Sequence, residues 1–105
     1  MTKMDHQLET EYAGATLRLE ISDRAEALQH KSSRYEVHLF INGVHRDEAR
    51  SNAEVISLRL ASPLQTGYEQ HEFIEATVTY TTDEICAHIS SAEQVIADQQ
   101  ISRRG

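Results

Sequence analysis

A chain of 105 residues with 39% hydrophobic and 26% charged side chains is long enough to bury one hydrophobic core. Its net charge of −7 opposes nonspecific binding to nucleic acid and attraction to anionic membranes, since both depend on basic surfaces. A single cysteine excludes an internal disulfide and fits a reducing compartment.

No targeting or membrane-spanning segment is expected. Residues 1–7 lack the apolar stretch of a secretory signal, and no apolar run approaches the roughly 18 residues of a membrane span. We therefore expect a cytoplasmic protein whose partners are neither nucleic acid nor membrane.

The first third of the chain predicts an arm, a strand and a short helix. Residues 1–11 are polar and aperiodic, which favours a flexible N-terminal arm. Residues 13–22 alternate apolar and polar side chains, as a strand with one dry face does. Asp23 is followed three residues later by Glu26 ahead of good helix formers, which predicts a capped surface helix over 23–31.

The clearest strand covers residues 34–41 and runs into Asn42-Gly43. This dipeptide between apolar residues predicts a hairpin, because both central positions of a type I′ turn need a positive φ. The returning arm, residues 44–50, is so rich in charge that we expect it to pair briefly or to form a helical turn.

The next segments predict a strand, a loop and a strand. Residues 53–61 alternate as a strand does, although Ala53, Ile56 and Leu60 also fit one helical face; we prefer a strand because the run stops at Ser62-Pro63. Residues 62–70 are expected to be a loop, and residues 71–80 a long strand.

The C-terminal third allows two interpretations. Thr81 and Glu84 match a capping box for a long helix that carries Ile85, Ile89, Ala92 and Ile96 on one face. Residues 83–90 also alternate as a strand, and a second capping box at Ser90 and Glu93 would then start a shorter final helix. In both interpretations an amphipathic helix ends near Gln100.

The predicted fold is therefore α+β. It is an antiparallel sheet of four or five strands with the C-terminal amphipathic helix packed on one face. The single domain spans 12–101 and is followed by a tail, 102–105. The alternative is an all-β sandwich with one helix. The expected core consists of Leu17, Leu19, Ile21, Val37, Leu39, Ile41, Ile56, Leu58, Leu60, Ile74, Val78, Ile89 and Ile96.

Catalytic residues are not indicated. Cys86 and His88 would share one face of a strand, which is a crude requirement for a thiolate–imidazole pair, but nothing around them indicates an orienting Asn or Asp or an oxyanion donor. The chain also lacks a phosphate-binding glycine loop and the common hydrolase motifs, and no cofactor is expected.

The best metal candidates surround the strand at 71–80. His71, Glu72 and Glu75 lie on or beside its polar face, and His38 joins them if the strand at 34–41 is adjacent. His38, His71 and Glu75 then form a two-imidazole, one-carboxylate set of the kind that zinc uses. A solvated sheet face with charge pairs is the simpler interpretation.

The two phenylalanines are both predicted on the wet face of the sheet. Phe40 lies between inward-facing residues, and Phe73 shares its face with Glu75. Exposed aromatic side chains among polar ones are typical of a contact patch.

We therefore expect a non-enzymatic interaction module (an inhibitor, adaptor or immunity-type protein) that binds a protein or a second copy of itself through Phe40, Phe73, His38 and Glu75. The homodimer would pair through a sheet edge or the polar face. A small metal- or ligand-binding protein using His38, His71 and Glu75 is the alternative.

Overall fold

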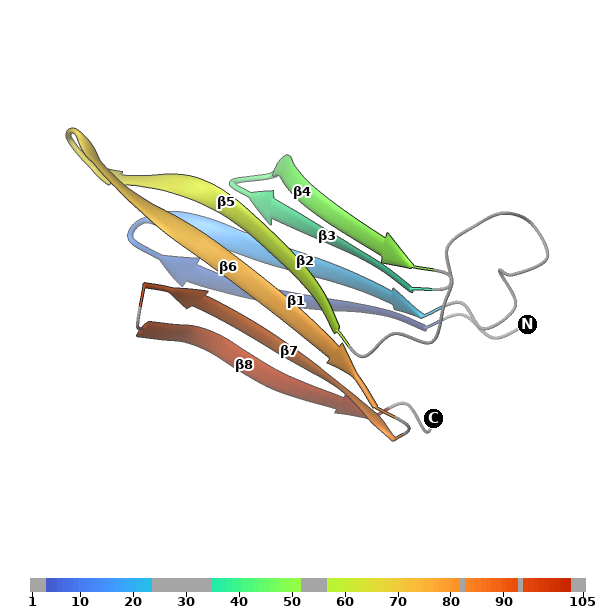
Figure 1. Ribbon diagram of the computed structural model, residues 1–105. Helices are drawn as coiled ribbons and strands as arrows, with labels where there is room; N and C mark the ends of the chain where they lie inside the picture. Colours follow the sequence, from blue (N-terminus) through green and yellow to red (C-terminus); the bar gives the residue numbers. More distant parts are fainter. Residues whose placement is uncertain (1–3, 24–34, 52–56, 82, 93, 103–105) are drawn as a thin grey trace.

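The computed structural model describes residues 4–23, 35–51, 57–81, 83–92 and 94–102. In these residues the chain folds into eight strands, arranged as two four-stranded antiparallel sheets (Figure 1). The strands are β1 (Met4–Tyr12), β2 (Ala15–Asp23), β3 (Tyr35–Ile41), β4 (Val44–Ser51), β5 (Ser57–Gly67), β6 (Gln70–Tyr80), β7 (Glu84–Ser91) and β8 (Gln94–Ser102).

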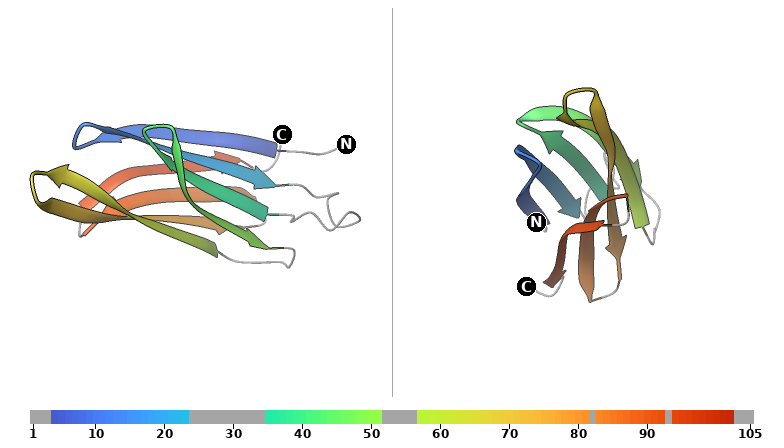
Figure 2. Two further views of the ribbon diagram at one scale, coloured as in Figure 1. Left: turned by 90° about the horizontal axis from the view of Figure 1, so that it is seen from above. Right: turned by 90° about the vertical axis from the view of Figure 1, so that its left-hand side faces the viewer.

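Each sheet is a simple meander, in the order β1-β2-β3-β4 or β5-β6-β7-β8. The two sheets lie face to face, as the views in Figure 2 show, and their inner faces form one apolar core. Tyr35 of the first sheet and Tyr80 of the second meet in that core, with ring centroids 4.3 Å apart. The molecule is a small single β-sandwich.

The expected core is correct wherever the structure describes it. Its members on β2, β3, β5, β6 and β7 are buried, and Ile96 of β8 is half-buried. Ile56 lies outside the described residues. Apolar residues at alternate positions of a strand all point to the same face, and in this fold that face packs against the opposite sheet. The alternation in the sequence therefore identifies the core residues.

The α+β prediction is wrong, because no helix is present in any of the described ranges and residues 94–102 form β8. The helical spacing of Ile89, Ala92 and Ile96 arises instead from a hairpin. Ala92 has a φ of 53° in the turn, and the register of β7 with β8 shifts between Ile89 and Ser90. A turn followed by a bulge produces the same spacing of apolar residues as a helix does. Residues 94–102 form a strand because they pair with β7. The all-β alternative is nearer to the structure, but its helix is absent from the described part as well.

Three further expectations need correction. Residues 4–12, expected as a loose arm, form β1 and pair with β2 along their whole length. Residues 44–51 form the complete strand β4. Residues 62–67 are not a loop but continue β5, where Pro63 is tolerated because an edge strand has a side without ladder bonds. The helix expected over 23–31 lies outside the described residues, apart from Asp23 at the end of β2.

The hairpin predicted at Asn42-Gly43 is confirmed. The two residues have φ angles of 51° and 81°, as a type I′ turn requires, and they connect β3 directly to β4. The turn is also bound to β2, because Asn42 Oδ1 accepts a hydrogen bond from the Thr16 backbone N–H at 2.9 Å. Ala13 and Gly14 form an equivalent turn between β1 and β2.

Side chains of β4 cover the edge of β5 where the two sheets meet. Asp47 Oδ2 accepts a hydrogen bond from the Ala61 backbone N–H at 2.9 Å, and the Arg46 guanidinium donates to the Pro63 carbonyl at 3.3 Å. The outermost strands at the other side of the sandwich are β1 and β8. Within the part of the chain that is described, no helix is long and apolar enough to cross a membrane.

Candidate functional site

The residues expected on one wet face lie on opposite sides of the sandwich. His38 and Phe40 project from the outer face of the β1–β4 sheet, and Phe73 and Glu75 from the outer face of the β5–β8 sheet. His71 also belongs to the second sheet, so His38, His71 and Glu75 do not come together. Period-two alternation shows which side chains share a face of one strand, but it does not say which strands share a sheet.

The two phenylalanines differ in their surroundings. Phe40 is half-buried, with the Arg18 guanidinium 4.3 Å from its ring centroid and the His45 ring packed edge-on at 5.2 Å. Phe73, in contrast, is 62% exposed. Of the two phenylalanines, Phe73 is therefore the one that offers an aromatic surface to a partner.

Phe73 belongs to a hairpin that extends beyond its sheet. Strands β5 and β6 pair as far as Gly67 and Gln70, whereas β6 begins to pair with β7 only at Ile74. The end of this hairpin, residues 63–73, is here called the finger, and it projects past β7 in Figure 1. Tyr68 at its tip is 89% exposed. Tyr68 does not stand out in the sequence, because residues 62–70 have the composition of an ordinary loop.

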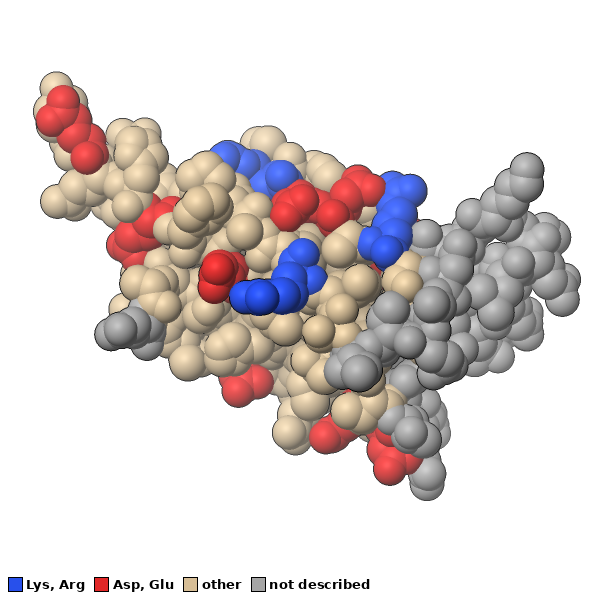
Figure 3. All heavy atoms as spheres, viewed as in Figure 1, with Lys and Arg blue, Asp and Glu red and all other residues tan. Residues whose placement is uncertain are grey.

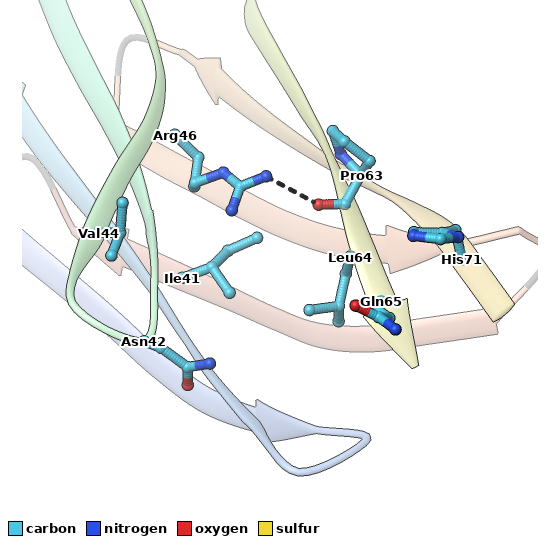
Figure 4. A pocket seen from close by; sticks show the side chains of 8 residues that line it. All are labelled: Ile41, Asn42, Val44, Arg46, Pro63, Leu64, Gln65 and His71. Carbon is cyan, nitrogen blue, oxygen red and sulfur yellow. Dashed lines mark hydrogen bonds between the residues drawn. The ribbon is translucent and has the colours of Figure 1, made fainter. Parts of the chain in front are cut away.

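A cleft of about 470 Å³ separates the finger from the β3–β4 turn (Figure 4). Its volume is in the range of small-molecule sites. Apolar side chains lie toward the sandwich, and Arg46 spans the cleft to the Pro63 carbonyl. The lining residues are Ile41, Asn42, Val44, Arg46, Pro63, Leu64, Gln65 and His71.

A cluster of two histidines and two glutamates occupies the outer face of β3 and β4. His38 Nδ1 lies 2.9 Å from His45 Nε2 and 3.9 Å from Glu48 Oε1, and His45 Nε2 lies 3.5 Å from the same oxygen. On its other side, His38 Nε2 lies 2.8 Å from Glu36 Oε2. Arg50 pairs with the second oxygen of Glu48 and, at 3.4 Å, with Glu36.

A β-bulge makes this cluster possible. The register of β3 with β4 shifts between Leu39 and Phe40, so that Arg46 is an extra residue in β4. In a regular strand, side chains three residues apart point to opposite faces. With the bulge, His45 and Glu48 lie on the same outer face. The sequence does not indicate that His45 and Glu48 are neighbours, because residues three positions apart lie on one face of a helix but on opposite faces of a regular strand.

A second polar cluster joins the two sheets at the end where the hairpins turn. Glu72 Oε1 accepts a hydrogen bond from the Tyr12 hydroxyl of β1 and another from the Ser91 hydroxyl of β7, both at 2.6 Å. The bonds from Ser91 and Tyr12 hold the pKa of the Glu72 carboxyl below its ordinary value. The Glu72 carboxylate in turn raises the pKa of Tyr12. These bonds make Glu72 a structural link and not, as the sequence suggested, a metal candidate beside His71.

Cys86 and His88 share the outer face of β7, but the thiol is not activated. Burial raises the pKa of Cys86, and the carboxylates of Glu84 and Asp98 raise it further. His88 Nδ1 faces Asp98 Oδ2 at 3.8 Å. A thiol whose pKa is raised stays protonated at neutral pH, so this pair is unsuited to nucleophilic catalysis.

Comparisons of the chain with family models, with curated proteins and with solved structures gave no match.

Proposed function

We propose that the protein is a non-catalytic interaction module that binds a protein partner through the finger and the adjoining outer face of β6. The observation that carries the proposal is the position of Tyr68 and Phe73. These two aromatic side chains are 89% and 62% exposed, and both lie on the β5–β6 hairpin, which projects beyond the end of β7. Exposed aromatic side chains rimmed by polar residues are frequent anchors of protein interfaces.

Charge indicates the chemistry of the partner. Residues 57–102, which include the whole second sheet, contain seven acidic residues and one basic residue, Arg59. Figure 3 shows acidic side chains at the projecting end of the β5–β6 hairpin. A partner with a basic rim around an apolar pocket complements this surface, and such complementarity speeds association. Glu75, next to Phe73 on the outer face of β6, belongs to the same surface, whereas His38 and Phe40 do not.

The test begins with capture of the partner from the native host and its identification by mass spectrometry. Affinity for the purified partner is then measured with Phe73→Ala and Tyr68→Ala. We expect each substitution to weaken binding at least about tenfold, because interface aromatic residues carry a large share of binding energy. The melting temperature should stay nearly unchanged, since both side chains are mostly outside the core.

Phe40→Ala is the matched control, because Phe40 is the other phenylalanine and lies on the outer face of the opposite sheet. It should bind as the wild type does. Light scattering of the pure protein tests whether the partner is a second copy, in which case Phe73→Ala converts a dimer to a monomer. The proposal fails if both finger variants retain full affinity, or if the protein binds neither a host protein nor itself.

A cytoplasmic location is part of the proposal. It is supported by the single cysteine, Cys86, whose thiol is free in the structure.

A further inference from the structure

We propose that His38, His45 and Glu48 form a binding site for a divalent zinc-class ion on the outer face of the β1–β4 sheet. The three side chains offer two imidazole nitrogens and one carboxylate oxygen, all within 4.8 Å of one another. Zinc binds this combination with three protein ligands and keeps its fourth position for water.

The distances between the donor atoms fit a tetrahedral ion. Ligands at zinc distances of 2.0–2.2 Å on adjacent corners of a tetrahedron are roughly 3.3–3.5 Å apart. The three separations in the protein are 2.9, 3.5 and 3.9 Å. Opening the His38–His45 contact by a few tenths of an ångström and closing the His38–Glu48 distance by a similar amount therefore suffices. Small rotations of half-exposed side chains produce such shifts.

Glu36 orients His38 for this task. Its carboxylate accepts the Nε2–H of His38 at 2.8 Å, which directs the lone pair of His38 Nδ1 toward His45 and Glu48. Without an ion, the Nε2–H of His45 donates a hydrogen bond to that lone pair. With the ion bound, His45 has its proton on Nδ1 and offers Nε2 to the metal. Metal-bound histidines commonly donate their second N–H to a carboxylate in the same way, and that carboxylate strengthens binding.

The charge of the cluster favours a cation. The carboxylate of Glu48 lies beside both histidines and supplies negative charge for a divalent ion, and the Arg50 guanidinium contacts its second oxygen and also Glu36. Arg50 contacts Oε2 of Glu48 and leaves Oε1 directed toward the histidines. On the neighbouring strand Arg18 and Glu20 pair with each other at 3.2 Å.

The site is independent of the proposed interaction surface, because it lies on the opposite sheet. A bound ion links β3 to β4 through His45 and Glu48, which lie on either side of the bulge residue Arg46. Of the metal set expected from sequence, only His38 is retained, while His45 and Glu48 take the places of His71 and Glu75.

The test titrates Zn²⁺ into the full-length, untagged protein after dialysis against a chelator, by calorimetry and by thermal melting. We expect one equivalent to bind and the melting temperature to rise with zinc concentration. His38→Ala, His45→Ala and Glu48→Gln should each weaken binding by tenfold or more. Glu36→Gln should weaken it by about 10–100-fold, as loss of a supporting carboxylate does. Co²⁺ in place of Zn²⁺ should give the intense visible absorption of a four-coordinate ion.

Matched controls are His71→Ala and His88→Ala, which remove exposed or half-exposed histidines of the other sheet. Both should bind zinc as the wild type does, and Phe73→Ala should as well. Melting temperatures without metal establish that the variants fold. The proposal is overturned if no saturable binding occurs, if His45→Ala binds zinc normally, or if the control variants lose it equally.

Discussion

At the level of single residues, Glu72 forms hydrogen bonds that connect the two sheets at one end of the sandwich. It faces inward from β6 in line with buried Ile74, yet its carboxylate is kept ionised by hydroxyl donors from two other strands. A carboxylate at the rim of a core is tolerated when such donors replace water. Because Tyr12 belongs to the first sheet and Ser91 to the second, one side chain connects both.

This arrangement predicts a pH dependence of stability. The folded-state pKa of Glu72 is lower than the unfolded one, so the unfolded chain binds the proton first as the pH falls. The carboxylate therefore stabilises the fold at neutral pH, and this contribution is lost as the pH falls through the folded-state pKa. We expect Glu72→Gln to lower the melting temperature at pH 7, with a difference from wild type that shrinks in acid.

Tyr12→Phe removes one of the donors and should reproduce part of this loss. The matched control is Glu75→Gln, the same substitution on the exposed face of β6, which should melt as the wild type does across the pH range. A pH-independent difference for Glu72→Gln would show that the ionised carboxylate is not the stabilising species.

At the level of elements, turns and bulges place the residues that matter. The tight turn at Asn42-Gly43 sets the register of β4, and the bulge at Arg46 then places His45 and Glu48 on one face. The finger, in turn, exists because β5 and β6 extend beyond the end of β7. Local backbone geometry thus determines both proposed sites, although their chemistry comes from different sheets.

The positive φ of Gly43 in the β3–β4 turn predicts how much a Gly43→Ala substitution destabilises the fold. Gly43 has a φ of 81°, and a Cβ added there would meet no atom within 4 Å, so the cost of Gly43→Ala is conformational strain alone. We expect a loss of about 1–2 kcal/mol in the free energy of unfolding, measured by urea denaturation. Gly14→Ala, at the same φ in the β1–β2 turn, should lose a similar amount.

The control is Gln99→Ala on exposed β8, which should stay within about 0.5 kcal/mol of wild type. Unchanged stability of both glycine variants would mean that the turns relax to other geometries.

At the level of the whole molecule, charge and open edges act together. The second sheet and its hairpins are strongly acidic, and β1 and β8 each have one edge that pairs with no strand of their own sheet. Unpaired strand edges favour association between molecules, and charge repulsion opposes it. The net charge of −7 therefore opposes association through these edges at neutral pH.

We consequently expect solubility to fall sharply in mild acid. Protonation of the six histidines alone changes the formal charge from −7 to −1, and the isoelectric point is about 5.2. Turbidity and light scattering measured from pH 8 to pH 4 should show a maximum of association near the isoelectric point. At lower pH the growing net positive charge should restore solubility. A solubility that does not vary with pH would mean that the edges are protected by other means.

Sequence by itself determined the inward faces of the strands and the Asn42-Gly43 hairpin, because alternation and turn chemistry are local properties. It also determined the acidic charge and identified Phe73 as an outward-facing aromatic residue. Only the tertiary structure decided that β8 is a strand, that Phe73 lies on a projecting finger, and that His38 meets His45 and not His71. These outcomes depend on which strands pair and where a register slips by one residue. Such pairings join residues far apart in the chain, and no local pattern records them.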